Sequence, residues 1–117
     1  MSVFYEKENL LSVFDSVRII DKHAEVIEYT LLNEFKQRLD LYISTYDEYA
    51  TVTFMREDEK SWFFDVGIKN LEKIIYEEDT LKFYKNDNAE NPALTVKMKP
   101  GISLWCRAET PRKSKTD

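Results

Sequence analysis

The middle and the end of the chain alternate between apolar and polar residues. Over residues 38–44, Leu39, Leu41 and Ile43 are separated by polar side chains, which is the two-residue period of a strand with one buried face. Residues 71–77 fit either a strand or a helix. The two-residue period also returns in residues 50–55, 62–68, 81–83, 94–98 and 102–106. The pattern therefore predicts a protein built mainly from β-strands.

The N-terminal part of the chain has a mixed pattern. Apolar residues between Leu10 and Val17 recur at spacings of three and four, so we expect an amphipathic helix from about Glu6 to Ser16. Beyond this helix, β-branched and aromatic residues favour a strand from Glu25 to Leu31.

Short connections rich in turn-forming residues link the predicted strands. Parallel strands need crossovers of about a dozen residues or more, so consecutive strands are expected to pair antiparallel. The apolar face of the sheet is expected to be covered by the N-terminal helix or by the sheet closing on itself. We therefore expect an α+β fold, mainly β. It consists of an antiparallel meander of about six to eight strands with the helix packed on it. In an alternative arrangement the sheet is strongly curved or barrel-like.

The length of the chain indicates its domain organisation, and its charged residues indicate an acidic protein. A chain of 117 residues fits one globular domain, which we place at residues 1–107. Residues 108–117 offer nothing that would anchor them in a core, so a disordered polar tail is expected there. The formal net charge is −5. Residues 1–106 contain 13 Lys and Arg against 20 Asp and Glu, so this part of the chain carries a charge of −7.

Catalytic and cofactor sites have little support in the sequence. The two glycines, Gly67 and Gly101, lie far apart, so no glycine-rich loop can hold a phosphate. His23 is the single histidine, and its position next to Asp21 is explained by a polar turn better than by a general base. Cys106 continues an apolar alternation, which is typical of a buried thiol. We therefore expect no enzyme, no bound cofactor and no metal site.

The sequence also bears on location and on broad partner classes. No apolar run approaches the roughly 20 residues of a transmembrane helix. Residues 6–8 are all charged, whereas the apolar region of a signal peptide would begin at about this position. We expect a cytoplasmic protein with no membrane contact, either a monomer or a homodimer. Direct nucleic-acid binding is disfavoured because a net acidic surface repels phosphates.

Acidic turns form the first candidate binding surface. In an up-and-down meander alternate turns share one end of the sheet, so two acidic turns are expected to lie together beside Lys99–Gly101. Exposed acids of this kind keep a protein soluble, or they attract a protein partner with a basic surface, such as a toxin or a nuclease. The acidic residues are Glu57, Asp58, Glu59, Glu77, Glu78 and Asp79.

Large aromatic residues on the polar side of the predicted sheet form the second candidate surface. Such side chains are enriched at protein interfaces. They also stabilise sheets through cross-strand pairs, so both interpretations stay open. The residues are Tyr42, Phe63, Tyr84 and Trp105.

Part of the chain resembles the small β-rich immunity proteins of bacterial polymorphic toxin systems. The resemblance is carried by residues 38–43, 49–54 and 62–71 within a region covering residues 17–75. Several of these families have a Phe-x-x-Val-x-Asn-Leu cadence near a strand end, whereas here Gly67-Ile68-Lys69 separates Val66 from Asn70. The resemblance implies a cytosolic protein that binds a cognate toxin tightly and blocks its active site, often meeting a basic surface with an acidic one.

Three hypotheses about function follow. The preferred one is a non-enzymatic inhibitor of the toxin-immunity type. A close variant is a phage-encoded inhibitor of a bacterial defence nuclease, of the anti-CRISPR type, with an acidic surface that mimics nucleic acid. The third is a small-ligand-binding β domain with Trp62, Phe64 and Phe83 as the walls of its pocket.

Overall fold

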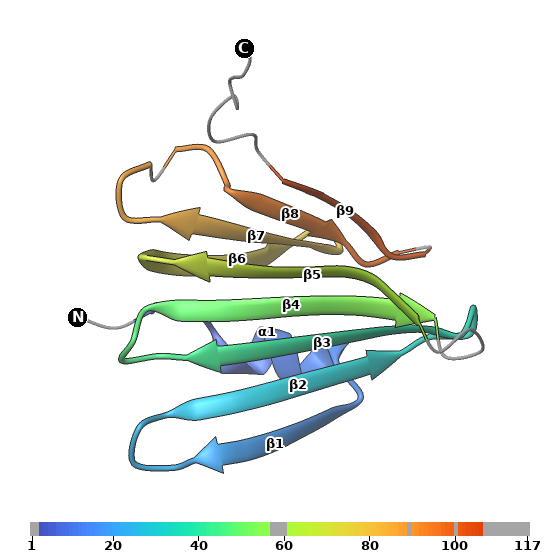
Figure 1. Cartoon of the computed structure of the whole chain (residues 1–117), viewed down its shortest axis with the longest axis horizontal. Helices are drawn as coiled ribbons and strands as arrows, with labels where there is room; N and C mark the ends of the chain where they lie inside the picture. Colours follow the sequence, from blue (N-terminus) through green and yellow to red (C-terminus); the bar gives the residue numbers. More distant parts are fainter. Residues whose placement is uncertain (1–2, 57–60, 89, 100, 107–117) are drawn as a thin grey trace.

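The computed structural model describes residues 3–56, 61–88, 90–99 and 101–106, with only the backbone of residues 61–63, 105 and 106. These residues form one helix and nine strands (Figure 1). The elements are α1 (Lys7–Val13), β1 (Ser16–Asp21), β2 (Val26–Leu32), β3 (Gln37–Ser44), β4 (Tyr49–Arg56), β5 (Ser61–Lys69), β6 (Leu71–Glu77), β7 (Thr80–Lys85), β8 (Leu94–Lys97) and β9 (Ser103–Cys106). The ambiguous residues 71–77 are thus a strand.

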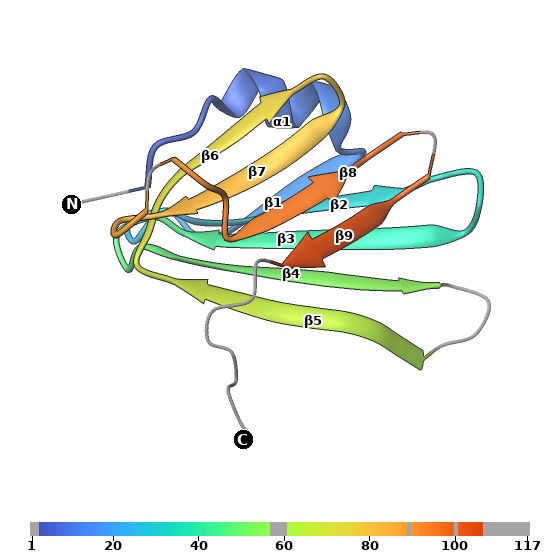
Figure 2. The same ribbon diagram turned by 90° about the horizontal axis from the view of Figure 1, so that it is seen from above.

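The strands are divided between two open sheets. Neighbouring strands follow the order β1-β2-β3-β4-β5 in one sheet and β6-β7-β8-β9 in the other, and each neighbouring pair is antiparallel. Figure 2 shows the two sheets as separate layers, with α1 beside β6 in the second layer. The mainly β antiparallel meander with an N-terminal helix is confirmed. The sheets are not closed into a barrel, and the described strands exceed the expected number by one.

The core lies between the two layers and is built by the predicted alternation. Leu39, Leu41 and Ile43 of β3 are at most 1% exposed, and so are Leu81 and Phe83 of β7. Side chains of both sheets and of α1 belong to one apolar cluster. Burying each such side chain is worth about 1.5–3 kcal/mol relative to leaving it in water, so this cluster holds the layers together.

One residue carries the chain from the first sheet to the second. Asn70 separates β5 from β6 and has a φ of 56°, a left-handed conformation that asparagine tolerates better than most residues. Backbone bonds fix this corner, since Leu71 N donates to Glu48 O at 2.9 Å and Asn86 N donates to Asn70 O at 2.8 Å. The sharp corner is the reason why one expected sheet becomes two.

The N-terminal segment completes the second layer. Phe4 pairs with β6 in parallel, because Phe4 N donates to Glu72 O and Ile74 N donates to Phe4 O, both at 2.9 Å. The helix that follows is shorter than the expected range of Glu6 to Ser16. Phe14 ends it in an extended conformation, and its ring packs against Tyr29 with centroids 5.6 Å apart. Packing of Phe14 in the core therefore takes precedence over another helical turn.

Strand β1 is an exposed edge. All six of its residues are exposed, and Ile19 is 62% exposed although its register partner Ile27 is buried. The register shifts between Ile19 and Asp21, and such a bulge discourages pairing with another edge. Whether the protein is a monomer or a homodimer stays a prediction.

Tyr29 should make the stability of the fold fall at alkaline pH. The residue is 1% exposed, and burial, with the nearby Tyr5 hydroxyl as a smaller cause, raises the pKa of Tyr29 above its ordinary value of 10.0. The unfolded chain then loses its proton near pH 10 while the folded chain keeps it. Stability is fully present below pH 10 and falls above it, at up to about 1.4 kcal/mol per pH unit for one group.

Urea denaturation between pH 9 and pH 12 tests this expectation. The Tyr29→Phe variant should lose less stability across that range than the wild type, because it has no hydroxyl to titrate at this position. Equal losses in both proteins would show that Tyr29 does not drive alkaline unfolding.

Candidate protein-binding surfaces

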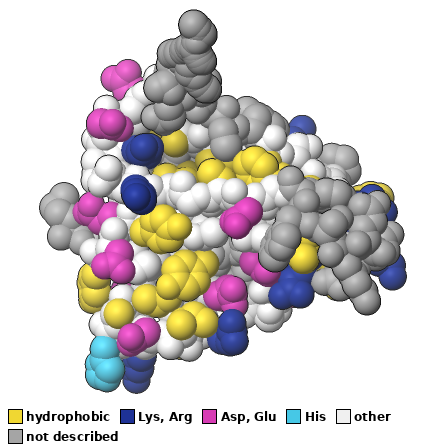
Figure 3. Space-filling model, in the orientation of Figure 1, with side chains coloured by type: hydrophobic (Ala, Val, Ile, Leu, Met, Phe, Trp, Pro, Cys, Tyr) yellow, Lys and Arg dark blue, Asp and Glu magenta, His cyan; other side chains and the backbone are white. Residues whose placement is uncertain are grey.

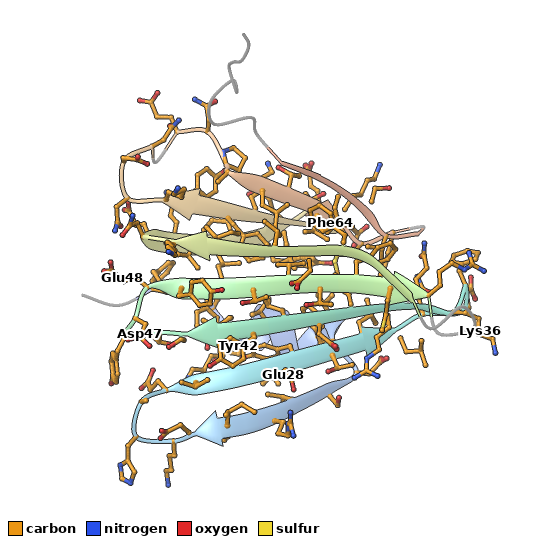
Figure 4. All side chains as sticks on the ribbon, in the orientation of Figure 1. Glu28, Lys36, Tyr42, Asp47, Glu48 and Phe64 are labelled. Atoms are coloured by element: carbon orange, nitrogen blue, oxygen red, sulfur yellow. The ribbon has the colours of Figure 1, made fainter. Side chains whose placement is uncertain are left out.

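The first candidate surface is the outer side of the five-stranded sheet, which faces away from the second layer and is called the open face below. The strand register aligns Glu28, Tyr42 and Thr51 in one row across β2, β3 and β4. Thr30, Asp40 and Thr53 form the adjacent row, which ends on Asp65 of β5. Figure 4 looks onto this face, with Tyr42 and Glu28 on neighbouring strands. The open face is therefore a mixed polar surface.

Charged groups of the open face are mostly paired with one another. Arg18 Nη2 lies 2.8 Å from Glu28 Oε1, and Arg38 Nε lies 3.2 Å from Asp40 Oδ1. Thr53 Oγ1 donates to Asp65 Oδ1 at 3.3 Å. Exposed ion pairs contribute little to stability, about 0–1 kcal/mol each. Both arginine side chains are exposed and both carboxylates are partly exposed, so a binding partner can reach these charges.

Two tyrosines contribute apolar area to the open face. Tyr42 and Tyr49 are both half-buried. A Cβ atom added to Gly67 would lie 2.6 Å from Tyr49 Oη and 3.2 Å from its Cζ, so the Tyr49 ring lies across the glycine. Figure 3 shows hydrophobic side chains between acidic and basic ones on this side of the molecule. Tyrosine offers much contact area at low entropic cost, so this surface suits a protein partner.

The predicted aromatic face is distributed over both sheets. Tyr42 belongs to β3, whereas Tyr84 belongs to β7 and lies beneath Lys73, whose Nζ is 5.0 Å from the ring centroid. The corner at Asn70 separates them, so Tyr42 and Tyr84 do not share one face. The side chains of Phe63 in β5 and Trp105 in β9 lie outside the described residues. Their role in binding stays a prediction.

The structure describes only one of the two turns that form the predicted acidic end. Glu57, Asp58 and Glu59 lie outside the described residues. Glu77, Glu78 and Asp79 are exposed at the turn between β6 and β7, where Glu78 and Asp79 have φ values of 52° and 59°. Two consecutive residues with positive φ are typical of a tight hairpin turn.

Lysines partly neutralise this turn. Lys82 Nζ lies 3.4 Å from Glu77 Oε2, and Lys99 Nζ lies 4.0 Å from Asp79 Oδ1. The Tyr76 hydroxyl donates to Asp79 at 3.1 Å, and burial together with this hydrogen bond raises the pKa of Tyr76. Met98 N donates to Asp79 O at 2.8 Å, so Lys99 lies beside the acidic turn, as expected. Lys82 and Lys99 thus offset part of the negative charge of residues 77–79.

The structure also places the residues considered for chemistry and for a ligand pocket. His23 is exposed in a turn where its backbone N–H, and that of Ala24, donate to Asp21 Oδ1 at 3.1 Å. Phe83 is 0% exposed and Phe64 packs against the core cluster. Neither phenylalanine lines the cleft between α1 and β6 or the cleft between α1, the β2–β3 turn and β6. Among the described residues, no group of three or more His, Cys, Asp or Glu side chains is arranged to hold a metal ion.

The sequence reasoning missed one larger feature. A cleft of about 560 Å³ lies between α1, the β2–β3 turn, β6 and the segment after β8. Its lining comes from four separate parts of the chain, so only the tertiary structure brings it together.

In the part of the chain that the structure describes, no helix has the length and apolar character needed to cross a membrane.

Comparison with solved structures finds the same fold in another protein. The match is a chain described as "Contact-dependent growth inhibition toxin - immunity protein complex from Klebsiella pneumoniae 342". The TM-score is 0.64. The match covers 88% of this chain and 93% of that chain, at 14% sequence identity. No protein-family model matches the sequence, and a search of the curated proteins finds no match.

Likeness at this level of identity shows a common fold. The fold expected from the sequence resemblance therefore has a counterpart in a solved toxin–immunity protein complex. Because the match spans most of both chains, it includes both sheets and is not limited to a common hairpin.

Proposed function

We propose that this chain is an immunity-type protein, a non-enzymatic inhibitor that binds a toxin and neutralises it. The observation that carries the proposal is the fold shared with a chain of a toxin–immunity protein complex over 88% of this chain. The resemblance of residues 17–75 to β-rich immunity proteins rests on sequence pattern, and it leads to the same class of protein.

The proposed toxin has a basic surface. Residues 1–106 carry a formal charge of −7, and charge complementarity between partners speeds their association and disfavours wrong partners. Partly exposed acids are present on the open face, including Glu28 and Asp40, and exposed acids at the turn formed by residues 77–79. The proposed protein acts in the cytoplasm, on the toxin itself, without binding nucleic acid.

The open face is the proposed centre of the interface. It combines the half-buried rings of Tyr42 and Tyr49 with accessible charges around them. Interfaces of this kind place aromatic anchors at the centre and charged residues at the rim. The turn at residues 77–79 then contributes long-range attraction.

Co-expression with a candidate toxin domain taken from a neighbouring gene tests the proposal. Cells producing the toxin domain should lose viability, and cells producing both proteins should form as many colonies as cells with an empty vector. Isothermal titration of the two purified proteins should give a tight one-to-one complex. The matched control is an unrelated toxin domain of similar charge, which the chain should not neutralise.

Undiminished killing, with the soluble chain present and no complex in the titration, would overturn the proposal. Protection of a phage against a bacterial defence nuclease, in place of protection against the toxin, would instead support the anti-defence hypothesis.

A further inference from the structure

The cleft of about 560 Å³ has an apolar floor and a polar rim. Val13 and Leu31 are partly buried members of the core periphery, and Met98 is 3% exposed. Polar groups surround them, namely Ser12, Asn33, Glu34, Tyr76 and Lys99. A volume of this size is typical of ligand sites, which are about 300–1,000 Å³ and combine apolar walls with a few polar groups.

Hydrogen bonds hold the wall formed by the β2–β3 turn in place. Asn33 Oδ1 accepts from Phe35 N at 2.9 Å and from Gln37 N at 3.0 Å. Gln37 Oε1 in turn accepts from Asn33 Nδ2 at 2.8 Å and from Ile102 N at 3.1 Å. The last bond ties the turn to the segment that precedes β9. Glu34 thus projects from a turn that is fixed before any partner binds.

The cleft lining has one acid and one base, Glu34 and Lys99. Lys99 Nζ lies 4.0 Å from the Asp79 carboxylate. Asp79 also accepts a hydrogen bond from the Tyr76 hydroxyl. Glu34 makes no ion pair or side-chain hydrogen bond with any described residue. Together with Asp79, the described charges at the cleft are two carboxylates and one ammonium group, which leaves a net negative charge.

We propose that this cleft receives a basic side chain, arginine or lysine, from the protein partner. The methylene groups of such a side chain would lie on Val13 and Leu31, and its cationic head would reach the Glu34 carboxylate. Long basic side chains bury their stems on apolar surface in this way while the charge stays near water. The inference rests on the proposed function for the identity of the partner, but the cleft's preference for a cation can be tested without it.

The probe is the peptide acetyl-Gly-Arg-Gly-amide, titrated into the ¹⁵N-labelled full chain and followed by NMR. Saturable shifts are expected at backbone amides around the cleft, including Val13, Asn33, Glu34 and Lys99. The same peptide with citrulline, which keeps the shape and removes the charge, should bind about fivefold more weakly. A lysine peptide should bind at the same amides.

Three variants make the test specific. Glu34→Gln should weaken binding of the arginine peptide about fivefold, and Lys99→Gln should strengthen it, because the two charges act on a cation with opposite signs. Glu90→Gln is the matched control, since Glu90 is an exposed acid that does not line the cleft and belongs to neither candidate binding surface. It should leave the affinity unchanged.

The absence of localised shifts would overturn the inference, as would equal effects of Glu34→Gln and Glu90→Gln. Stronger binding of acetyl-Gly-Glu-Gly-amide would also overturn it, because the cleft would then prefer an anion. Binding of the arginine peptide without neutralisation of the toxin would contradict the proposed function alone. Neutralisation without peptide binding would contradict the cleft inference alone.

Discussion

Replacing Phe83 by alanine should lower the free energy of unfolding by about 3–5 kcal/mol. Phe83 is 0% exposed and lies in β7 opposite Ile74 of β6 and Leu94 of β8. Removing the ring leaves a cavity that rigid strands on both sides cannot fill. Because small domains are stable by only about 5–15 kcal/mol, this one change should remove a large part of the total.

Urea denaturation of the wild type and the Phe83→Ala variant measures the effect. The control is Phe35→Ala, which changes the same side chain at a position that is 46% exposed, and it should cost much less. The ligand-pocket hypothesis predicts only a small loss of unfolding free energy for Phe83→Ala, since a ring that lines an open pocket can be removed with little loss of stability. A small cost at Phe83 would therefore contradict the packing described above and revive that hypothesis.

Replacing Tyr42 by alanine should weaken toxin binding by about 30-fold, or ~2 kcal/mol, if the open face is the interface. Tyr42 lies in the row between Glu28 and Thr51, within the mixed surface of the five-stranded sheet. An aromatic anchor at the centre of an interface contributes most when its neighbours exclude water around it. The loss should appear mainly as faster dissociation.

Tyr84→Ala is the matched control for this prediction. Tyr84 is also half-buried, but it belongs to the second sheet and is covered by Lys73. Surface plasmon resonance with the immobilised toxin domain gives both dissociation rates, and circular dichroism checks that both variants fold. Equal rates for Tyr42→Ala and the wild type would place the interface elsewhere, and a selective effect of Tyr84→Ala would move it to the second sheet.

The sequence predicted the central strands well because each of them has one wet side and one buried side. The alternation at Leu39, Leu41 and Ile43 is strict, and all three side chains are buried. Residues 71–77 were ambiguous because Ile74, Ile75 and Tyr76 form a continuous apolar run. Pairing with Phe4 on one side and β7 on the other makes this segment a strand.

The candidate binding residues could be assigned from the sequence only to a side of a strand. The alternation indicates that Tyr42 and Tyr84 both point away from the core, but it does not indicate which sheet each belongs to. The predicted binding residues did not include Glu28 and Asp40, because the acidic surface was predicted from turns, whereas these two residues lie within strands. Their positions opposite the buried residues of β2 and β3 were the signal that would have found them.

The sequence by itself determined the antiparallel meander, the acidic character of the chain and the inward-facing residues of the central strands. These properties depend on neighbouring residues and on short connections. The tertiary structure alone decided the division into two sheets, which depends on the left-handed conformation of Asn70. It also decided the cleft, because residues as distant as Ser12 and Lys99 meet there. A two-residue period records which side of a strand is buried, and it carries no information about what covers that side.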